Sequence, residues 1–197
     1  MQSRQQQQHK VYGVYIKSML SIKLVLSIRE IGKNVKQNLE RKITSQIEGK
    51  CIVEGFIQPN SVKIISYSSG NVISDLIEFH AVYECMVAHP VEGMLVEASA
   101  KTITKAGIHA QVVDEDGNIP ITVFVAKDHH HIDQLFNTVV ENDKITVKVI
   151  GTRYELNDPY ICVIAKLVSV DSGNLGKQKP RINIGKEMEM GTSDEFD

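Results

Sequence analysis

One long segment of the chain has a helical period, and β-type segments lie on both sides of it. Five apolar residues recur there at intervals of four: Ile31, Val35, Leu39, Ile43 and Ile47. Charged residues lie off that stripe, so the spacing predicts an amphipathic helix over residues 32–47. Gly49 follows at the position where helices favour a left-handed residue.

The segments around this helix predict a small antiparallel sheet. Before the helix, residues 18–28 alternate, which predicts a strand with one buried face. Its apolar residues are Met19, Ile22, Leu24, Leu26 and Ile28. After Gly49, further strands are predicted over residues 51–57, 62–67 and 76–87, with an exposed hairpin or loop at 66–75 (SYSSGNVISD). Residues 11–88 therefore predict an α+β domain of strand, helix and antiparallel sheet, which is an RNP-like arrangement.

A second, all-β unit is predicted over residues 89–170. Pro90 cannot donate to a sheet ladder, and with His89 and Gly93 it marks the boundary. Five strands separated by turn residues follow, over residues 94–104, 107–113, 119–125, 143–154 and 159–168. A short helical piece at 131–140 interrupts them after the third strand, as in an OB-fold or S1-type barrel.

Composition restricts the remaining possibilities. Residues 1–10 are rich in Gln and predict disorder, and residues 171–197 predict a flexible charged tail. With 22 basic and 24 acidic residues, any contact with nucleic acid must be a local patch.

No apolar run reaches the length of a membrane span, so we expect an intracellular protein. Three scattered cysteines, Cys51, Cys85 and Cys162, predict buried small hydrophobes in a reducing compartment.

No pattern of catalytic or metal-ligating residues stands out. Adjacent residues cannot all face one ion, so His129, His130 and His131 predict an exposed turn between strand and helix. Glu115 and Asp116 fit a hairpin turn. No phosphate-binding loop, nucleophile elbow or paired aspartates for Mg²⁺ occur, so we expect no cofactor, no metal site and no enzymatic activity of the chain by itself.

Four segments of the chain, in order, carry motifs of one known protein family. The helix segment NVKQNLERKITSQIEGKCIVE runs into Gly55-Phe56-Ile57. HPVEG at 89–93 is similar to the family's junction between domains, and ITKAGIHA at 103–110 to its barrel hairpin. VIGTRYELNDPYICVIAKL at 149–167 resembles its closing hairpin. Together these segments resemble the stalk subunit of archaeal and eukaryotic RNA polymerases, which is the seventh subunit of RNA polymerase II or its archaeal counterpart, and the resemblance covers residues 11–168.

The resemblance implies a non-catalytic subunit that docks on the polymerase core with its first domain and contacts nascent RNA with its barrel. Its partners would be the large catalytic subunits, a second stalk subunit and single-stranded RNA. The docking residues implied are Ser68, Ser69, Gly70, Asn71, Gly55, Phe56 and Pro90, besides the helix 32–47. Such a protein works in the nucleus of a eukaryotic cell, or in the viral factory, cytoplasm or virion if it comes from a large DNA virus.

An OB-type barrel binds single strands through basic residues and aromatic stacking platforms. The candidates here are Lys101, Lys105, His109, Phe124, Lys127, Arg153 and Tyr154. Two alternatives stay open at this point: Phe124 could belong to the core, and Arg153 could form a structural ion pair. Aromatic residues are 6% of the chain, so weak and salt-sensitive binding is expected.

The departures from the family leave other functions open. The tip region 66–75 has a single glycine, Gly70, and His89 stands where the family has Arg before its junction proline. These departures suit a copy carried by a large DNA virus. The alternative function is a free-standing S1-type RNA-binding protein in translation or RNA decay, and a third is a purely structural adaptor.

Overall fold

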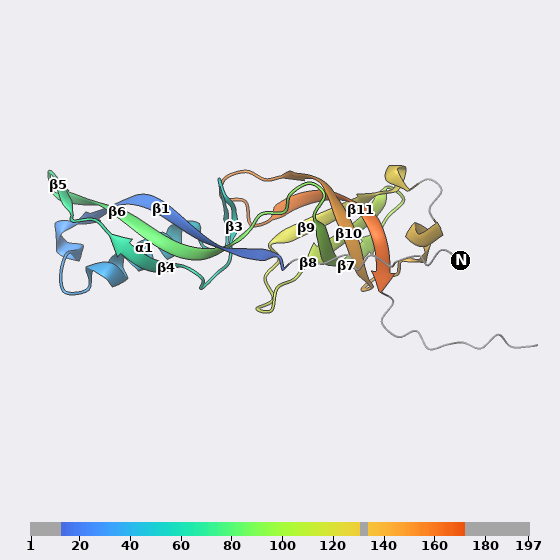
Figure 1. Ribbon diagram of the computed structural model, residues 1–197, viewed down its shortest axis with the longest axis horizontal. Helices are drawn as coiled ribbons and strands as arrows, with labels where there is room; N and C mark the ends of the chain where they lie inside the picture. Colours follow the sequence, from blue (N-terminus) through green and yellow to red (C-terminus); the bar gives the residue numbers. More distant parts are fainter. Residues whose placement is uncertain (1–12, 131–133, 172–197) are drawn as a thin grey trace, which may run out of the picture.

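The computed structural model describes residues 13–130 and 134–171. Figure 1 shows two units placed end to end along the long axis of the molecule. The first is an antiparallel sheet with one long helix against it, and the second is a closed barrel of five strands. The predicted fold class, an α+β unit followed by an OB-type barrel, is confirmed. The predicted disordered start at 1–10 and nearly all of the predicted tail lie outside the described residues.

Two long strands form the backbone of the first unit. Strand β1 (Tyr15–Ser27) pairs along its whole length with β6 (Leu76–Ala88). Helix α1 (Val35–Ile47) buries Leu39, Ile43 and Ile47 against the sheet, and Gly49 beyond its end has a φ of +69°. This confirms the helix from Val35 onward and its glycine stop, whereas the predicted start at residue 32 is wrong and Ile31 lies before the helix.

The first strand was predicted over residues 18–28, and in the structure it begins earlier, at Tyr15, and ends at Ser27. Met19 is exposed because it stands out of phase with the buried residues Leu24 and Leu26. Ile28 does not extend the strand but begins a 3₁₀ turn, η1 (Ile28–Glu30). Glu30 accepts hydrogen bonds from the backbone N–H and the hydroxyl of Ser27, at 2.8 and 2.9 Å. This capping interaction ends the strand, and the alternation of apolar residues does not reveal it.

Three shorter pieces of chain complete the first sheet. The segment predicted as one strand over 51–57 is a hairpin of β2 (Cys51–Ile52) and β3 (Gly55–Ile57), turning at Val53 and Glu54. Strands β4 (Lys63–Tyr67) and β5 (Asn71–Ile73) both pair antiparallel with β6. Of the two predictions for residues 66–75, a hairpin or an exposed loop, the structure shows a hairpin, in which β5 turns into β6 at Ser74 and Asp75.

The barrel has the strand order β10-β11-β9-β8-β7, with β10 closing onto β7. Its strands are β7 (Leu95–Ile103), β8 (Gly107–Val112), β9 (Ile121–Ala126), β10 (Lys144–Arg153) and β11 (Ile161–Asp171). Strand β11 runs parallel to β9, and the other pairs are antiparallel. Alternate residues fill the interior, so the barrel has a packed core. Two 3₁₀ helices, η2 (Lys127–His129) and η3 (Gln134–Thr138), lie between β9 and β10.

The two units share one hydrophobic core at their junction. Cys51, Phe56 and Ala88 come from the first sheet, yet they cluster with the buried residues of the barrel. The backbone N–H of Cys51 donates to the Asp158 carbonyl at 2.8 Å, and the N–H of Asn157 donates to the Cys51 carbonyl at 2.8 Å. The loop between β10 and β11 thus extends the β2–β3 hairpin, which fixes the barrel to the first sheet.

Two sequence predictions about single residues are corrected by the fold. His130 is buried, 5% exposed, and its ring stacks on Phe136 with centroids 5.4 Å apart. Its Nε2 accepts the backbone N–H of Leu167 at 3.1 Å, so this histidine joins η2 to β11 rather than standing in an exposed turn. Cys162 is exposed on the outside of the barrel, whereas Cys51 and Cys85 are buried as predicted. Burial raises the pKa of each of these two thiols to about 11.

A second link between the units joins β1 to the turn between β8 and β9. The Tyr15 hydroxyl donates to Asp114 Oδ2 at 2.9 Å. Desolvation opposes ionisation of Asp114, but hydrogen bonds from Asn118, Tyr15 and the Asp116 backbone outweigh it and hold the pKa of this carboxyl below its ordinary value. Desolvation, together with this hydrogen bond, raises the pKa of Tyr15.

We expect Tyr15→Phe to lower the unfolding free energy by about 1 kcal/mol at pH 7, because it removes a half-exposed hydrogen bond to a charged acceptor. A carboxyl with a depressed pKa stabilises the fold above its ordinary pKa of 3.8 and loses that contribution as pH falls through its lower folded value. The difference in unfolding free energy between the wild type and Tyr15→Phe should therefore be smaller at pH 3 than at pH 7. Urea unfolding at both pH values measures it, and an equal difference at pH 3 and 7 would contradict the role of Asp114.

Candidate nucleic-acid interface

A groove of about 520 Å³ crosses the outer face of the barrel. All five strands contribute to it, and in the middle the outward residues of β8, β9 and β11 lie side by side. Four predicted RNA-contacting residues line this groove together: Lys101, His109, Phe124 and Arg153. In OB-type barrels the face of the second and third strands is the usual site for oligonucleotides, and these strands are β8 and β9 here.

The floor of the groove is an aromatic pair. His109 on β8 faces Phe124 on β9 in the sheet register, and the ring centroids are 4.7 Å apart at 43°. Phe124 is half-buried and His109 is exposed, so both rings present a surface to the groove and Phe124 is not an interior core residue. Each ring of this tilted pair offers a face on which a base could stack.

Gly107 allows the Phe124 ring to lie close against the backbone of β8. A Cβ at this position would lie 2.4 Å from the Val125 carbonyl oxygen and 2.9 Å from two carbons of the Phe124 ring. Any side chain at Gly107 would therefore displace the aromatic platform.

The basic residues fall into two groups. Lys101 and Arg153 line the groove itself, and both are exposed. Arg153 Nη2 lies 3.7 Å from Glu155 Oε1, but an ion pair between exposed side chains is worth little, so the guanidinium stays available. Lys105 and Lys127 do not line the groove. They flank the turn between β7 and β8, where the N–H of Lys127 donates to the Ala106 carbonyl at 3.0 Å.

Tyr154 lies elsewhere than the sequence predicted. Its hydroxyl donates to the Val53 carbonyl at 3.0 Å, and its ring meets His89 edge to face with centroids 6.4 Å apart. This tyrosine belongs to the junction between the units and is absent from the groove lining. Further groove residues were missed in the sequence because they are small, polar or aliphatic: Gln111, Thr122, Thr152, Cys162 and Ile164.

The far end of the first sheet forms a second candidate surface, which we call the tip. Large apolar side chains stand exposed there: Ile28, Tyr67, Val72, Ile73 and Leu76. Beside them lies a cleft of about 320 Å³ between the start of α1 and strands β4 and β6, lined by Ile31, Tyr67, Gly70 and Phe79 among others. Exposed apolar groups gathered in this way are typical of surfaces that bind another protein.

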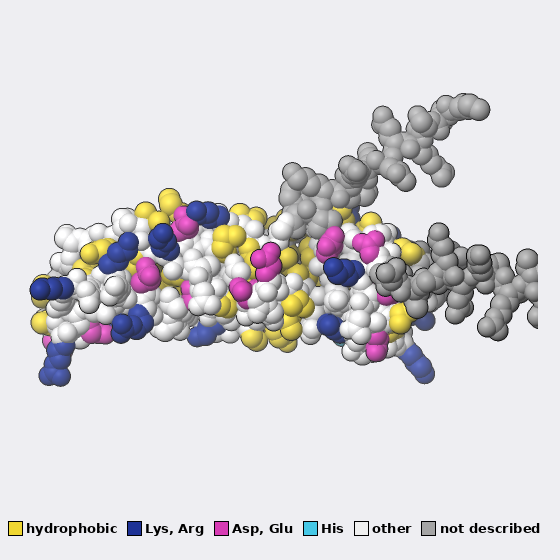
Figure 2. Space-filling model, turned by 90° about the horizontal axis from the view of Figure 1, so that it is seen from below, with side chains coloured by type: hydrophobic (Ala, Val, Ile, Leu, Met, Phe, Trp, Pro, Cys, Tyr) yellow, Lys and Arg dark blue, Asp and Glu magenta, His cyan; other side chains and the backbone are white. Residues whose placement is uncertain are grey.

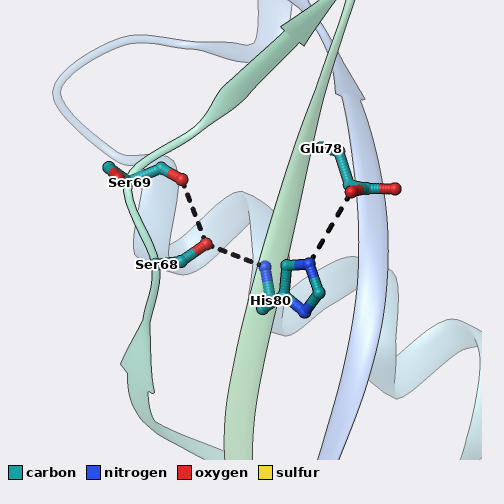
Figure 3. A network of polar contacts seen from close by, with 4 residues as sticks. All are labelled: Ser68, Ser69, Glu78 and His80. Atoms are coloured by element: carbon teal, nitrogen blue, oxygen red, sulfur yellow. Dashed lines mark hydrogen bonds and ion pairs between the residues drawn. The ribbon is translucent and has the colours of Figure 1, made fainter.

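Serine side chains hold the tip together where β4 and β5 are interrupted (Figure 3). The N–H of Ser68 donates to the His80 carbonyl at 2.9 Å, and the Ser68 hydroxyl accepts the N–H of His80 at 3.0 Å. The Ser68 hydroxyl also donates to the Ser69 carbonyl at 3.0 Å, and His80 Nε2 lies 3.7 Å from Glu78 Oε1. These contacts hold Ser68 and Ser69 beside β6, next to the exposed apolar side chains of the tip.

The predicted docking residues separate into two places. Ser68, Ser69, Gly70 and Asn71 lie at the tip. Gly55, Phe56 and Pro90 are buried at the junction, and Phe56 is part of the shared core. Because these three residues are buried, they expose little surface to a partner, and Phe56 packs between the two units.

Two other kinds of site are absent from the described part of the chain. Residues 13–130 and 134–171 contain no group of three His, Cys, Asp or Glu side chains that could hold a metal ion. None of the helices among them has the length and apolar run needed to cross a bilayer.

Charge on the surface is mixed. Figure 2 shows Lys and Arg side chains interspersed with Asp and Glu along one face of the molecule, with apolar side chains between them. This agrees with the near balance of 22 basic and 24 acidic residues. Contact with an anionic ligand must therefore depend on local groups and not on a field of one sign.

Comparison with known proteins places these features in context. No protein-family model matches the chain. It is 25% identical to DNA-directed RNA polymerase II subunit 7 of Arabidopsis thaliana over 155 residues, covering 70% of this chain and 84% of the relative. It is 24% identical to DNA-directed RNA polymerase II subunit RPB7 of Glycine max over 158 residues, covering 71% of this chain and 85% of the relative.

A viral relative is equally distant. Protein L376 of Acanthamoeba polyphaga mimivirus, assigned by name to a DNA-directed RNA polymerase, is 22% identical over 174 residues, covering 80% of this chain and 84% of the relative. Alignments of this length exceed the barrel, whose strands run from Leu95 to Asp171. The matches therefore extend over parts of both units, and the chain is a distant homologue of the seventh subunit of RNA polymerase II and of the mimivirus polymerase subunit.

Proposed function

We propose that the chain is the stalk subunit of a DNA-directed RNA polymerase, which docks on the polymerase core through its tip and contacts nascent RNA through its barrel groove. The observation that carries the proposal is homology to polymerase subunits along 84% of their length. A shared barrel alone would fit many RNA-binding proteins, whereas a match that also takes in the first sheet favours a dedicated docking unit.

The two surfaces divide the work in this proposal. The tip offers exposed aliphatic side chains and an apolar cleft, which suit a protein partner. The groove offers an aromatic pair with Lys101 and Arg153 at its rim, which suits a single strand. Neither surface presents a set of groups arranged for bond-making, so the chain is proposed to act as an accessory subunit whose partners perform catalysis.

Affinity purification of the tagged chain from its native source tests the proposal directly. We expect the large catalytic subunits of a polymerase to be recovered in stoichiometric amount and to survive nuclease treatment. Recovery of ribosomal or RNA-decay proteins in their place would overturn the stalk assignment in favour of a free-standing S1-type protein. Recovery of polymerase together with unchanged RNA crosslinking after charge reversal of Lys101, Lys105 and Arg153 would point to a purely structural adaptor.

Replacing Phe124 by alanine is expected to weaken binding of single-stranded RNA by about 1–3 kcal/mol, because one stacking platform is lost. Fluorescence anisotropy with a labelled oligonucleotide at low salt measures the change. Tyr67→Ala provides a control, since Tyr67 is an exposed aromatic on the first sheet. Equal affinities of the wild type and Phe124→Ala would remove the groove from the proposed RNA contact.

Cys162 provides an independent readout of the same groove. It is exposed and lines the groove, while Cys51 and Cys85 are buried with raised thiol pKa values, so a maleimide should label Cys162 selectively. Bound RNA is expected to slow this labelling in the wild type and to have less effect in Phe124→Ala. Labelling at the same rate with and without saturating RNA would show that RNA binds elsewhere.

A further inference from the structure

Two lysines face each other on the outside of the barrel, beyond the groove. Lys148 on β10 and Lys166 on β11 are direct partners in the sheet register. Both are exposed, and their sequence neighbours Val147, Val149, Ala165 and Leu167 are buried in the barrel core. Direct cross-strand partners have Cβ atoms about 5 Å apart, and like charges in this position destabilise the sheet.

No acidic side chain compensates for this pair among the described residues. The ion pairs there join Lys17 to Glu84, His80 to Glu78 and Arg153 to Glu155, and none includes either lysine. On the other side of β10, Lys148 pairs with Leu95 of β7, and the exposed Glu97 two residues further along forms no ion pair with it. Two uncompensated positive charges side by side suit a ligand that carries negative charge.

The lysine pair continues the groove along one strand. Ile164 lines the groove and is 50% exposed, and Lys166 lies two residues further on the same face of β11, about 7 Å away. Arg153, which faces Cys162 in the same strand pair, and Lys101 also line the groove. A strand that leaves the aromatic pair across Ile164 would therefore reach Lys166 and Lys148 next.

We propose that Lys148 and Lys166 form a phosphate-binding extension of the groove, which holds the backbone of a single-stranded RNA longer than the groove itself. This inference rests on the proposed RNA contact and adds a second contact on the fourth and fifth strands of the barrel, outside the face of the second and third. The extension carries no stacking ring, so it contributes affinity and salt dependence without preference for any base.

Oligonucleotides of two lengths separate the extension from the groove. We compare single-stranded RNAs of about 5 and about 15 nucleotides, within the range of sites on OB-type barrels, by anisotropy with the full chain at low salt. Lys148→Glu with Lys166→Glu is expected to weaken binding of the longer RNA about tenfold and to leave the shorter RNA unaffected. Loss of two phosphate contacts should also reduce the slope of log affinity against log salt by about 1.4 for the longer RNA.

Two control variants keep this test decisive. Lys33→Glu with Lys36→Glu changes the net charge equally on the first unit, and it should leave both RNAs bound as in the wild type. Lys148→Glu alone places opposite charges across the β10–β11 pair. It should therefore raise the midpoint of thermal unfolding and, at the same time, weaken binding of the longer RNA. That combination excludes misfolding as the cause of lost binding.

The outcomes of the oligonucleotide experiment distinguish the lysine extension from the groove. Unchanged affinity of the double variant for the longer RNA overturns the extension and leaves the groove in place. Equal loss for both lengths also overturns it, because the lysines would then act on the groove as a whole. Failure of the wild type to bind either RNA overturns the proposed RNA contact itself, and binding of an acidic protein lost in the double variant would assign the lysine pair to a protein partner instead.

Discussion

Replacing Gly55 by alanine is expected to lower the unfolding free energy by about 3 kcal/mol or more, because the backbone there has no room for a side chain. Gly55 has a φ of +132°, a region that L-residues with a side chain rarely adopt. A Cβ would also lie 2.3 Å from the carbonyl oxygen of Ala88. Neither strand can move freely, since Phe56 beside it is buried in the core that joins the two units.

Thermal and urea unfolding of the full chain measure this effect. Gly32→Ala is the matched control, since a Cβ there meets no atom within 4 Å and φ is not positive. We expect this control to change the unfolding free energy by no more than about 0.5 kcal/mol. A Gly55→Ala protein as stable as the wild type would show that the β2–β3 hairpin does not pack against β6 in this way.

Placing aspartate at both Val72 and Ile73 is expected to abolish recovery of polymerase subunits with the tagged chain. These side chains are 65% and 48% exposed at the tip, so they contribute little to the stability of the chain itself. Burying two carboxylates in an apolar interface costs several kcal/mol, which is enough to lower affinity by more than about a hundredfold. Recovery from native extracts, quantified against the wild type, gives the readout.

A double variant on the barrel controls for added charge. Val113 and Val140 are 48% and 54% exposed and lie far from the tip, so Val113→Asp with Val140→Asp should retain the polymerase. Circular dichroism should show all three proteins folded. Full recovery with the Val72 and Ile73 variant would contradict docking through the tip, and loss with both variants would assign docking to a wider surface.

Local sequence patterns predicted most of the elements and little of how they end. The four-residue spacing of Leu39, Ile43 and Ile47 predicts the helix, because a stripe of that period must face a core. Alternation of apolar residues likewise predicted β1 and β6, and turn residues between short segments predicted the five barrel strands. The hairpin at Val53 and Glu54 was missed, since its strands are only two and three residues long and no short alternation marks them.

Four of the groove residues were predicted from their residue type alone. Lys101, His109, Phe124 and Arg153 were chosen because basic and aromatic side chains suit a nucleic acid, and strand pairing then places them on one face. Tyr154 was chosen on the same grounds but packs at the junction with His89. Residue type cannot separate Phe124 from Tyr154, because both are partly buried aromatic residues and only their neighbours in space differ.

The amino-acid sequence by itself determined which segments are helix or strand and which side of each faces a core, because those properties depend on the spacing of neighbours along the chain. Only the tertiary structure decided which outward-facing residues of different strands lie next to one another. Closure of β10 onto β7 and the parallel pairing of β11 with β9 bring Cys162 and Ile164 beside Phe124 and set Lys166 opposite Lys148. These residues become neighbours through contacts between segments far apart in the chain. The spacing of apolar residues within one segment cannot predict such contacts.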